Sequence, residues 1–239
     1  MNPDIIGRSE PVPELADFGI IAFTTTRQIG TFGVLGEEPV RDVMGRWGDL
    51  RRELRAHGPR LATSGQVHGA NILMHGDTWA GWLRGDEADG HCAPVRGTAI
   101  AVTVADCVPV FVAHPSGITM LLHAGWRGTV AGIVPEALRV LRRRGLDASD
   151  LRLHLGPAIC GKCYEVSPDV FARLTGKTVD RPTPVDLRAI QAEQAKTAGV
   201  EQVSVSALCT RCNNDRFFSH RAGDAGRQVA VMVASVTLP

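Results

Sequence analysis

Two dense apolar segments near the middle of the chain constrain its fold most. Residues 98–104 (TAIAVTV) and 108–113 (VPVFVA) carry almost no polar side chains and are rich in β-branched residues. Strands without a polar alternation are typical of sheets that are covered on both faces. We therefore expect both segments to be strands in the interior of the protein.

Helical patterns alternate with these and other short strands. Apolar side chains recur every three or four positions over residues 40–57, where Gly58 and Pro59 end the pattern. A second helix is expected over residues 128–144, with Pro135 either kinking it or marking a later start. Capping residues predict helices over 167–174 and 186–198. Further strands are expected at residues 20–26, 61–63, 71–74, 118–122, 151–155, 203–205 and 228–236.

The order of these elements predicts the fold class. Strands and helices mix without a regular βαβ rhythm, and no linker divides the 239 residues. We expect an α/β protein with a single domain of mixed β-sheets flanked by helices. This domain would span residues 19–239, and residues 1–18 would form an N-terminal extension.

Composition excludes several classes of function. The formal net charge is only +1, so neither nucleic acid nor a membrane surface is an expected partner. No uninterrupted apolar stretch reaches the ~20 residues of a bilayer span, and the acidic, proline-containing N-terminus does not read as a signal peptide. We expect a cytoplasmic protein whose six cysteines serve as thiols or metal ligands.

Reactive side chains gather directly after the expected strands. His68, Cys107 and His123 all lie in such segments, among glycines that permit close approach. Two imidazoles and a thiolate form a reasonable zinc site, whose fourth position stays open for water or substrate as in catalytic zinc centres. The alternative is a buried thiol and two loop histidines that bond to the backbone. Spacing alone does not decide between them, because only the fold can bring these residues together.

Six motifs resemble one family. They are QVHG at residues 66–69, ADG at 88–90, ADCVPV at 105–110, HAGWRGT at 123–129, GPAICGKCYEV at 156–166 and CTRCNNDRFFSHR at 209–221. Over about residues 23–233 the chain is similar to the laccase-domain, or polyphenol oxidase-like, family. The resemblance implies a single α/β domain with mixed sheets. It also implies that His68, Cys107 and His123 are catalytic zinc ligands.

The resemblance also implies an activity. Members are described as zinc-dependent purine nucleoside phosphorylases with adenosine deaminase activity. The expected substrates are phosphate and a purine nucleoside (adenosine, inosine, guanosine or methylthioadenosine), with adenosine also deaminated. We expect the protein to be a monomer or a weak homodimer.

Five residues are candidates for substrate binding. Arg27 and Arg127 could hold phosphate, although either could equally form a surface ion pair. Trp126 could stack on the purine or belong to the core, while Gln66 and Asp106 flank the expected ligands. The segment after Arg27 (residues 28–33) is shorter than the family pattern at this place.

Three further residues lie in the family motifs. Tyr164 and Glu165 could line the same pocket, whereas a structural hydrogen bond is expected for His220.

Two CxxC pairs raise the question of a second metal. Cys160 and Cys163 form one pair, and Cys209 and Cys212 form the other. Two such pairs can make a zinc site with four thiolate ligands. The family resemblance accounts for much of both segments without a second metal, so we expect free thiols or an occasional disulfide here.

Other mechanisms remain open or are excluded by pattern. A deaminase of the cytidine type needs H-x-E and P-C-x-x-C, and neither occurs. A multicopper oxidase should carry H-x-H pairs, and none of the eight histidines stands two residues from another, although a single copper fits two imidazoles and a thiolate. Cys107 could instead be the nucleophile of a cysteine amidase, with His68 or His123 as base. A non-catalytic metal-binding protein is the remaining alternative.

Overall fold

The computed structural model describes residues 4–237, which form two six-stranded sheets and one two-stranded sheet. The first sheet has the order β1 (Glu10–Pro11), β2 (Ile20–Thr24), β14 (Gln228–Ala234), β7 (Thr98–Val104), β3 (Arg60–Gly65) and β5 (Gly81–Glu87). The second has the order β13 (Gln202–Val205), β10 (Arg152–Leu155), β8 (Val108–Ala113), β9 (Thr119–Ala124), β6 (Gly90–Ala93) and β4 (Ile72–Met74). In the third, β11 (Glu165–Val166) pairs with β12 (Thr183–Pro184).

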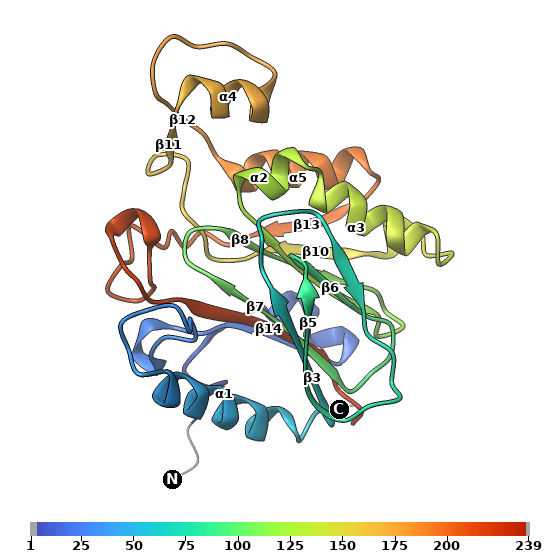
Figure 1. The fold of residues 1–239 in the computed structure, drawn as a ribbon. Helices are drawn as coiled ribbons and strands as arrows, with labels where there is room; N and C mark the ends of the chain where they lie inside the picture. The colour runs from blue at the N-terminus through green and yellow to red at the C-terminus, as the bar shows by residue number, and fades with distance from the viewer. Residues whose placement is uncertain (1–3, 238–239) are drawn as a thin grey trace.

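Helices cover the outer faces of the two large sheets, which pack against each other (Figure 1). Helix α1 (Val40–Leu54) lies on the first sheet. Helices α3 (Ile133–Arg142) and α5 (Leu187–Thr197) lie on the second, next to the short α2 (Trp126–Val130). Both large sheets contain parallel and antiparallel pairs. The prediction of one α/β domain with mixed sheets flanked by helices is confirmed.

Strands β7 and β8 match the predicted segments residue for residue, and both faces of each are covered. On β7, Ile100 and Val102 point between the two sheets while Ala99 points toward α1. On β8, Phe111 points between the sheets while Val110 points toward the helices of the second sheet. Each strand therefore carries apolar residues on both sides, which explains the absence of alternation in the sequence.

The segment expected to be helical over residues 128–144 forms two helices, and the later start that Pro135 indicated is confirmed, because α3 begins two residues before this proline. Helix α2 ends at Val130 and α3 begins at Ile133. Gly132 between them adopts φ +77°, a left-handed conformation that ends a helix and that glycine tolerates best. Pro135 lies in the first turn of α3, where its missing amide hydrogen removes no helical hydrogen bond. Helices α4 (Pro168–Thr175) and α5 begin, as predicted, after their capping residues.

Strands β5 and β6 are not among the strands predicted from the sequence. Strand β5 (GWLRGDE) forms an edge of the first sheet and exposes most of its residues, so it carries no apolar run. Strand β6 (GHCA) is fully buried but contains no β-branched residue. Both lack the composition by which strands are recognised.

The N-terminal segment packs on the domain. Strand β1 pairs with β2, and Leu15 in the 3₁₀ helix η1 (Pro13–Phe18) is fully buried. Residues 1–3 of the expected extension and residues 238–239 of the expected domain lie outside the described part of the chain. Within the described residues, no helix combines the length and the apolar character that a membrane crossing requires.

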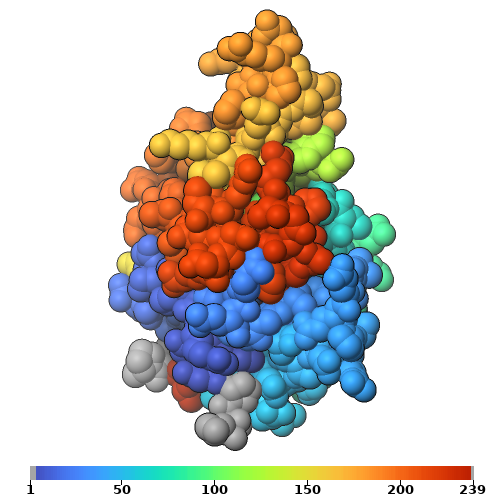
Figure 2. All heavy atoms as spheres, turned by 90° about the vertical axis from the view of Figure 1, so that its left-hand side faces the viewer, coloured from blue at the N-terminus to red at the C-terminus, as the bar shows by residue number. Residues whose placement is uncertain are grey.

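Two features of the surface bear on the site. The segment with β11, α4 and β12 projects from the top of the body, and α4 has no buried residue (Figure 1). Figure 2 shows the orange-red chain that precedes β14, which covers the middle of one face between the blue N-terminal residues and the gold α4 segment. We call this segment, residues 206–227 between β13 and β14, the covering chain. It includes the 3₁₀ helix η4 (His220–Ala222).

Candidate metal centre

Three side chains that are distant in the sequence converge where the chain passes between the two sheets. His68 follows β3, Cys107 lies in the turn between β7 and β8, and His123 is on β9. One donor atom from each lies within 4.8 Å of the other two. His123 is buried, Cys107 is half-buried and His68 is exposed, so the cluster opens to solvent on the His68 side. The structure therefore brings the predicted triad together.

Asp89, just before β6, organises this cluster. Its carboxylate is fully buried and accepts hydrogen bonds from the backbone amides of Val67 (3.1 Å), His68 (2.9 Å) and Gly69 (2.7 Å). It also accepts a 2.7 Å hydrogen bond from Nδ1 of His123. Burial would raise the pKa of Asp89, but these hydrogen bonds outweigh it and lower the pKa. The ionised carboxylate thus holds the His68 loop and orients the His123 ring.

The hydrogen bond to Asp89 determines which nitrogen His123 offers. With Nδ1 engaged, Nε2 is the atom available to a metal or to Cys107. Burial would lower the pKa of His123, yet the Cys107 thiolate and Asp89 raise it. Burial would likewise raise the pKa of Cys107, but His123 and the hydrogen bonds from His123 and His68 lower it. The cluster therefore stabilises a thiolate, the form that binds metals.

Glycines allow the donors to approach each other. A Cβ on Gly125 would lie 2.7 Å from Sγ of Cys107 and 3.3 Å from the His68 ring. A Cβ on Gly128 would lie 3.0 Å from the carbonyl oxygen of Gly69. Their positions in the HAGWRGT motif thus have a steric explanation.

Two of the predicted substrate residues have partners within the protein. The Gln66 carboxamide bonds to the backbone N–H, the carbonyl and the hydroxyl of Thr103. Asp106 has φ +81°, and its carboxylate accepts hydrogen bonds from Thr210 Oγ1 (2.6 Å) and from the Arg221 amide (2.7 Å). Gln66 thus connects the His68 loop to β7. The two hydrogen bonds to Asp106 hold the covering chain beside Cys107.

The other three substrate candidates lie in two places. Arg27 forms an ion pair with Asp224 and lies over the Phe218 ring, 4.5 Å from its centre. Arg127 and Trp126 open α2, directly after the strand that carries His123. The Arg127 side chain is exposed, with its guanidinium 4.4 Å from the centre of the Trp126 ring.

Neither Asp89 nor Arg221 is among the site residues predicted from the sequence, although Asp89 lies in one of the segments after the expected strands where reactive residues gather. Asp89 stands in the ADG motif, which marks the segment but not the role of the carboxylate. The Arg221 guanidinium lies 4.9 Å from the centre of the Tyr164 ring and donates to the carbonyl of Glu165. Burial raises the pKa of Tyr164 to about 12, with further contributions from the Cys107 thiolate and Asp106.

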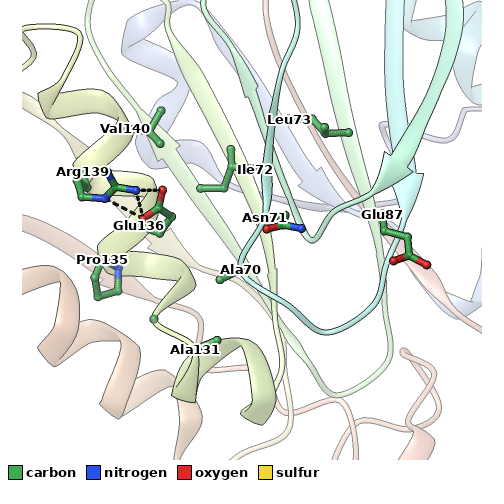
Figure 3. A pocket seen from close by; sticks show the side chains of 11 residues that line it. Ala70, Asn71, Ile72, Leu73, Glu87, Ala131, Pro135, Glu136, Arg139 and Val140 are labelled. Atoms are coloured by element: carbon green, nitrogen blue, oxygen red, sulfur yellow. Dashed lines mark hydrogen bonds and ion pairs between the residues drawn. The ribbon is translucent and has the colours of Figure 1, made fainter.

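A cavity of about 810 Å³ opens between residues 70–73 and helix α3. Figure 3 shows its lining, which comes from residues 70–73 after the His68 loop, from Glu87 at the end of β5, and from residues before and along α3. None of the three donors lines it, whereas Glu136 and Arg139, which form an ion pair, are among its lining residues. The cavity is therefore separate from the chemistry of the cluster.

Comparisons with known proteins identify relatives over most of the chain. A purine nucleoside phosphorylase of Streptomyces coelicolor is 32% identical over 219 residues, which are 88% of this chain and 89% of that protein. A purine nucleoside phosphorylase of Mycobacterium tuberculosis is 34% identical over 222 residues, or 85% of this chain and 88% of that protein. The crystal structure of YlmD from Geobacillus stearothermophilus superposes with a TM-score of 0.83 at 28% identity, covering 93% of each chain.

A family model accounts for residues 33–235, and its description is multi-copper polyphenol oxidoreductase laccase. The match includes all three donors and Asp89, and it confirms the resemblance seen in the sequence motifs. The chain belongs to this laccase-domain family.

Proposed function

We propose that this protein is a zinc-dependent purine nucleoside phosphorylase that also deaminates adenosine. The proposed nucleosides are adenosine, inosine, guanosine and methylthioadenosine. The observation that carries the proposal is the convergence of two imidazoles and one thiolate on a point that is open on one side. The relatives named purine nucleoside phosphorylases support the reaction type.

The donor set fits zinc. His68, Cys107 and His123 would be the ligands, and three protein ligands are typical of catalytic zinc sites. A zinc ion bound there supplies Lewis-acid polarisation of a substrate oxygen or nitrogen. Asp89 holds His123 so that Nε2 is the donor, and the low pKa of Cys107 keeps its sulfur ionised.

Phosphorolysis requires a held phosphate and a leaving purine. A phosphate oxygen forms a bond to the anomeric carbon as the glycosidic C–N bond breaks, and the purine leaves with that electron pair and takes up a proton. Arg127 and Arg221 carry exposed guanidinium groups near the cluster, and each guanidinium can bind two phosphate oxygens at once. The charge of Arg27 is balanced by Asp224, so we expect Arg27 to contribute less to phosphate binding.

Tyr164 is suited to contact the leaving base. Its raised pKa keeps the phenol protonated, so the hydroxyl can donate a hydrogen bond to a purine ring nitrogen. Deamination of adenosine replaces the 6-amino group with an oxygen from water and releases ammonia. For both reactions we place the purine next to Tyr164 and Trp126.

The test uses purified protein, adenosine and phosphate. Wild-type protein is expected to bind zinc at the triad and to form adenine, inosine or hypoxanthine, as measured by chromatography. Cys107→Ala is expected to lower turnover by about 1,000-fold or more, because it removes a metal ligand. Asp86→Asn, an exposed change on β5, is the matched control and should keep wild-type activity. Full activity in Cys107→Ala would contradict the mechanism.

One observation favours a second candidate, a cysteine amidase. Cys107, His123 and Asp89 lie in a row, as nucleophile, base and orienting carboxylate do in cysteine hydrolases. The second imidazole, His68, also bonds to Cys107 and has no task in that mechanism. An amidase would survive chelators and lose activity on thiol alkylation, whereas the proposed phosphorylase loses activity with both.

A further inference from the structure

The four cysteines of the two CxxC pairs form a second cluster outside the candidate metal centre. The Sγ atoms of Cys160, Cys163, Cys209 and Cys212 all lie within 4.8 Å of one another, although the two pairs are far apart in the sequence. Those of Cys163 and Cys212 are 3.4 Å apart. Tetrahedral zinc with Zn–S bonds of about 2.3 Å separates its sulfurs by roughly 3.8 Å. The spacing of these thiols is close to that arrangement.

The backbone around the cysteines is shaped as in a metal-binding knuckle. In the first pair, the amides of Cys163 (2.9 Å) and Tyr164 (3.1 Å) donate to the carbonyl of Cys160, which forms a tight turn. Across the pairs, the Cys160 amide donates to Sγ of Cys209 (3.3 Å), and the Cys212 amide does so within the second pair (3.4 Å). Such N–H···S bonds favour a thiolate and fix its direction.

The local charge suits a dianionic metal complex. Four thiolates and one zinc ion together carry a charge of −2. Each knuckle contains one exposed basic residue between its cysteines, Lys162 in the first and Arg211 in the second. The Arg211 guanidinium also donates to the carbonyl of Cys163 across the two knuckles (3.2 Å). These positive side chains offset the surplus negative charge.

We propose that Cys160, Cys163, Cys209 and Cys212 bind a structural zinc ion that joins the loop after β10 to the covering chain before β14. Four thiolate ligands close the coordination sphere, as in structural rather than catalytic zinc sites. This inference stands on the thiol geometry and does not depend on the proposed nucleoside reaction. It replaces the expectation of free thiols that the sequence alone suggests.

The zinc would hold residues that face the candidate metal centre. Tyr164 directly follows Cys163, and Thr210 directly follows Cys209 and bonds to Asp106 next to Cys107. The same covering chain brings the Arg221 amide to Asp106. In Figure 2 this orange-red chain lies on the surface next to the gold segment, although its Phe217 and Ser219 are buried. A cross-link through zinc would join its cysteine-containing end to the loop after β10.

The experiment measures zinc per chain by elemental analysis after dialysis under reducing conditions. Wild-type protein is expected to hold about two zinc ions. Cys107→Ala should hold about one, Cys160→Ser with Cys212→Ser about one, and the three changes together about none. Cys92→Ala, which removes a buried thiol outside both clusters, is the control and should keep about two. Cobalt substituted into Cys107→Ala should give the intense visible bands of tetrathiolate coordination.

Several results would overturn the proposal. They are a wild-type content that Cys160→Ser with Cys212→Ser leaves unchanged, a cobalt spectrum without thiolate bands, iron in place of zinc, or a Cys163–Cys212 disulfide in protein kept reduced. Cys212 is exposed, so Cys212→Ser alone serves if the double variant does not fold. Failure of the nucleoside assay leaves these metal measurements unaffected, so the two proposals fail separately.

Discussion

At the scale of single residues, Asp89 shows how a carboxylate outside the three candidate ligands controls their arrangement. It receives four hydrogen bonds, three from consecutive amides and one from His123. The sequence marks the ADG motif, but the role of Asp89 depends on a loop 20 residues away in the chain coming to it. The triad itself could be predicted from residue type and motif. Gly125 and Arg221 could not, because only contact distances reveal their roles.

Asp89→Asn is expected to weaken both the fold and the metal site. The amide group of asparagine cannot accept all four hydrogen bonds, so buried donors lose their partner. We expect the free energy of unfolding to fall by about 3 kcal/mol and zinc affinity to fall by about 10- to 100-fold. Chemical denaturation and a competitive zinc titration measure the two effects. Asp86→Asn is the exposed control, and equal zinc affinity in both variants would contradict the role of Asp89.

At the scale of secondary structure elements, a helix or strand can be predicted as well as its pattern of apolar residues is constrained. Strands β7 and β8 could be predicted to the residue because every position is constrained by a neighbouring layer. Helix α1 could be predicted from its single apolar stripe, and it ends three residues before the predicted His57. Pro135 indicated the later start of α3, but the exact place of the break could not be predicted, because the apolar pattern continues on both sides of Gly132, whose φ interrupts the helix.

The conformation of Gly132 predicts that alanine destabilises the folded protein there, whereas alanine at Gly45 in α1 stabilises it. Gly132→Ala forces a Cβ into the left-handed region, and we expect a loss of about 1 kcal/mol in the free energy of unfolding. Its Cβ would meet no atom closer than 4.0 Å, so the backbone alone is tested. Gly45→Ala, at an exposed site in α1 with open space around it, should instead stabilise by about 1 kcal/mol. Denaturant unfolding that shows the same sign for both would refute this reading.

At the scale of the whole molecule, a buried histidine pair connects stability to pH. His91 is fully buried, and its ring nitrogens contact Ser64 (3.1 Å) and His75 (2.8 Å). Burial, with a further contribution from the neighbouring His75, lowers the pKa of His91 to about 3. Burial lowers the pKa of His75 as well. Both rings are therefore neutral in the folded protein over a range in which the unfolded chain binds protons.

The sign of this effect follows from proton uptake. Below about pH 6.5 the unfolded state takes up a proton at His91, and the folded state does not until about pH 3. Stability should therefore decline on acidification across this window, by up to about 1.4 kcal/mol per pH unit from this residue. His91→Gln should show a shallower decline than wild type in metal-free urea unfolding between pH 6.5 and 4.5. The exposed His220→Gln is the control, and identical slopes in His91→Gln and wild type would be inconsistent with this account.

The location of the candidate metal centre has a mechanical consequence. His68 leaves a strand of the first sheet, His123 belongs to the second, and Cys107 lies where the chain crosses from one to the other. A cation bound by all three would cross-link the two sheets, because sliding one sheet over the other would separate His68 from His123. The arrangement of the three candidate ligands thus depends on how the two sheets are aligned, and the apolar contacts between β7 and β9 hold the sheets in that alignment.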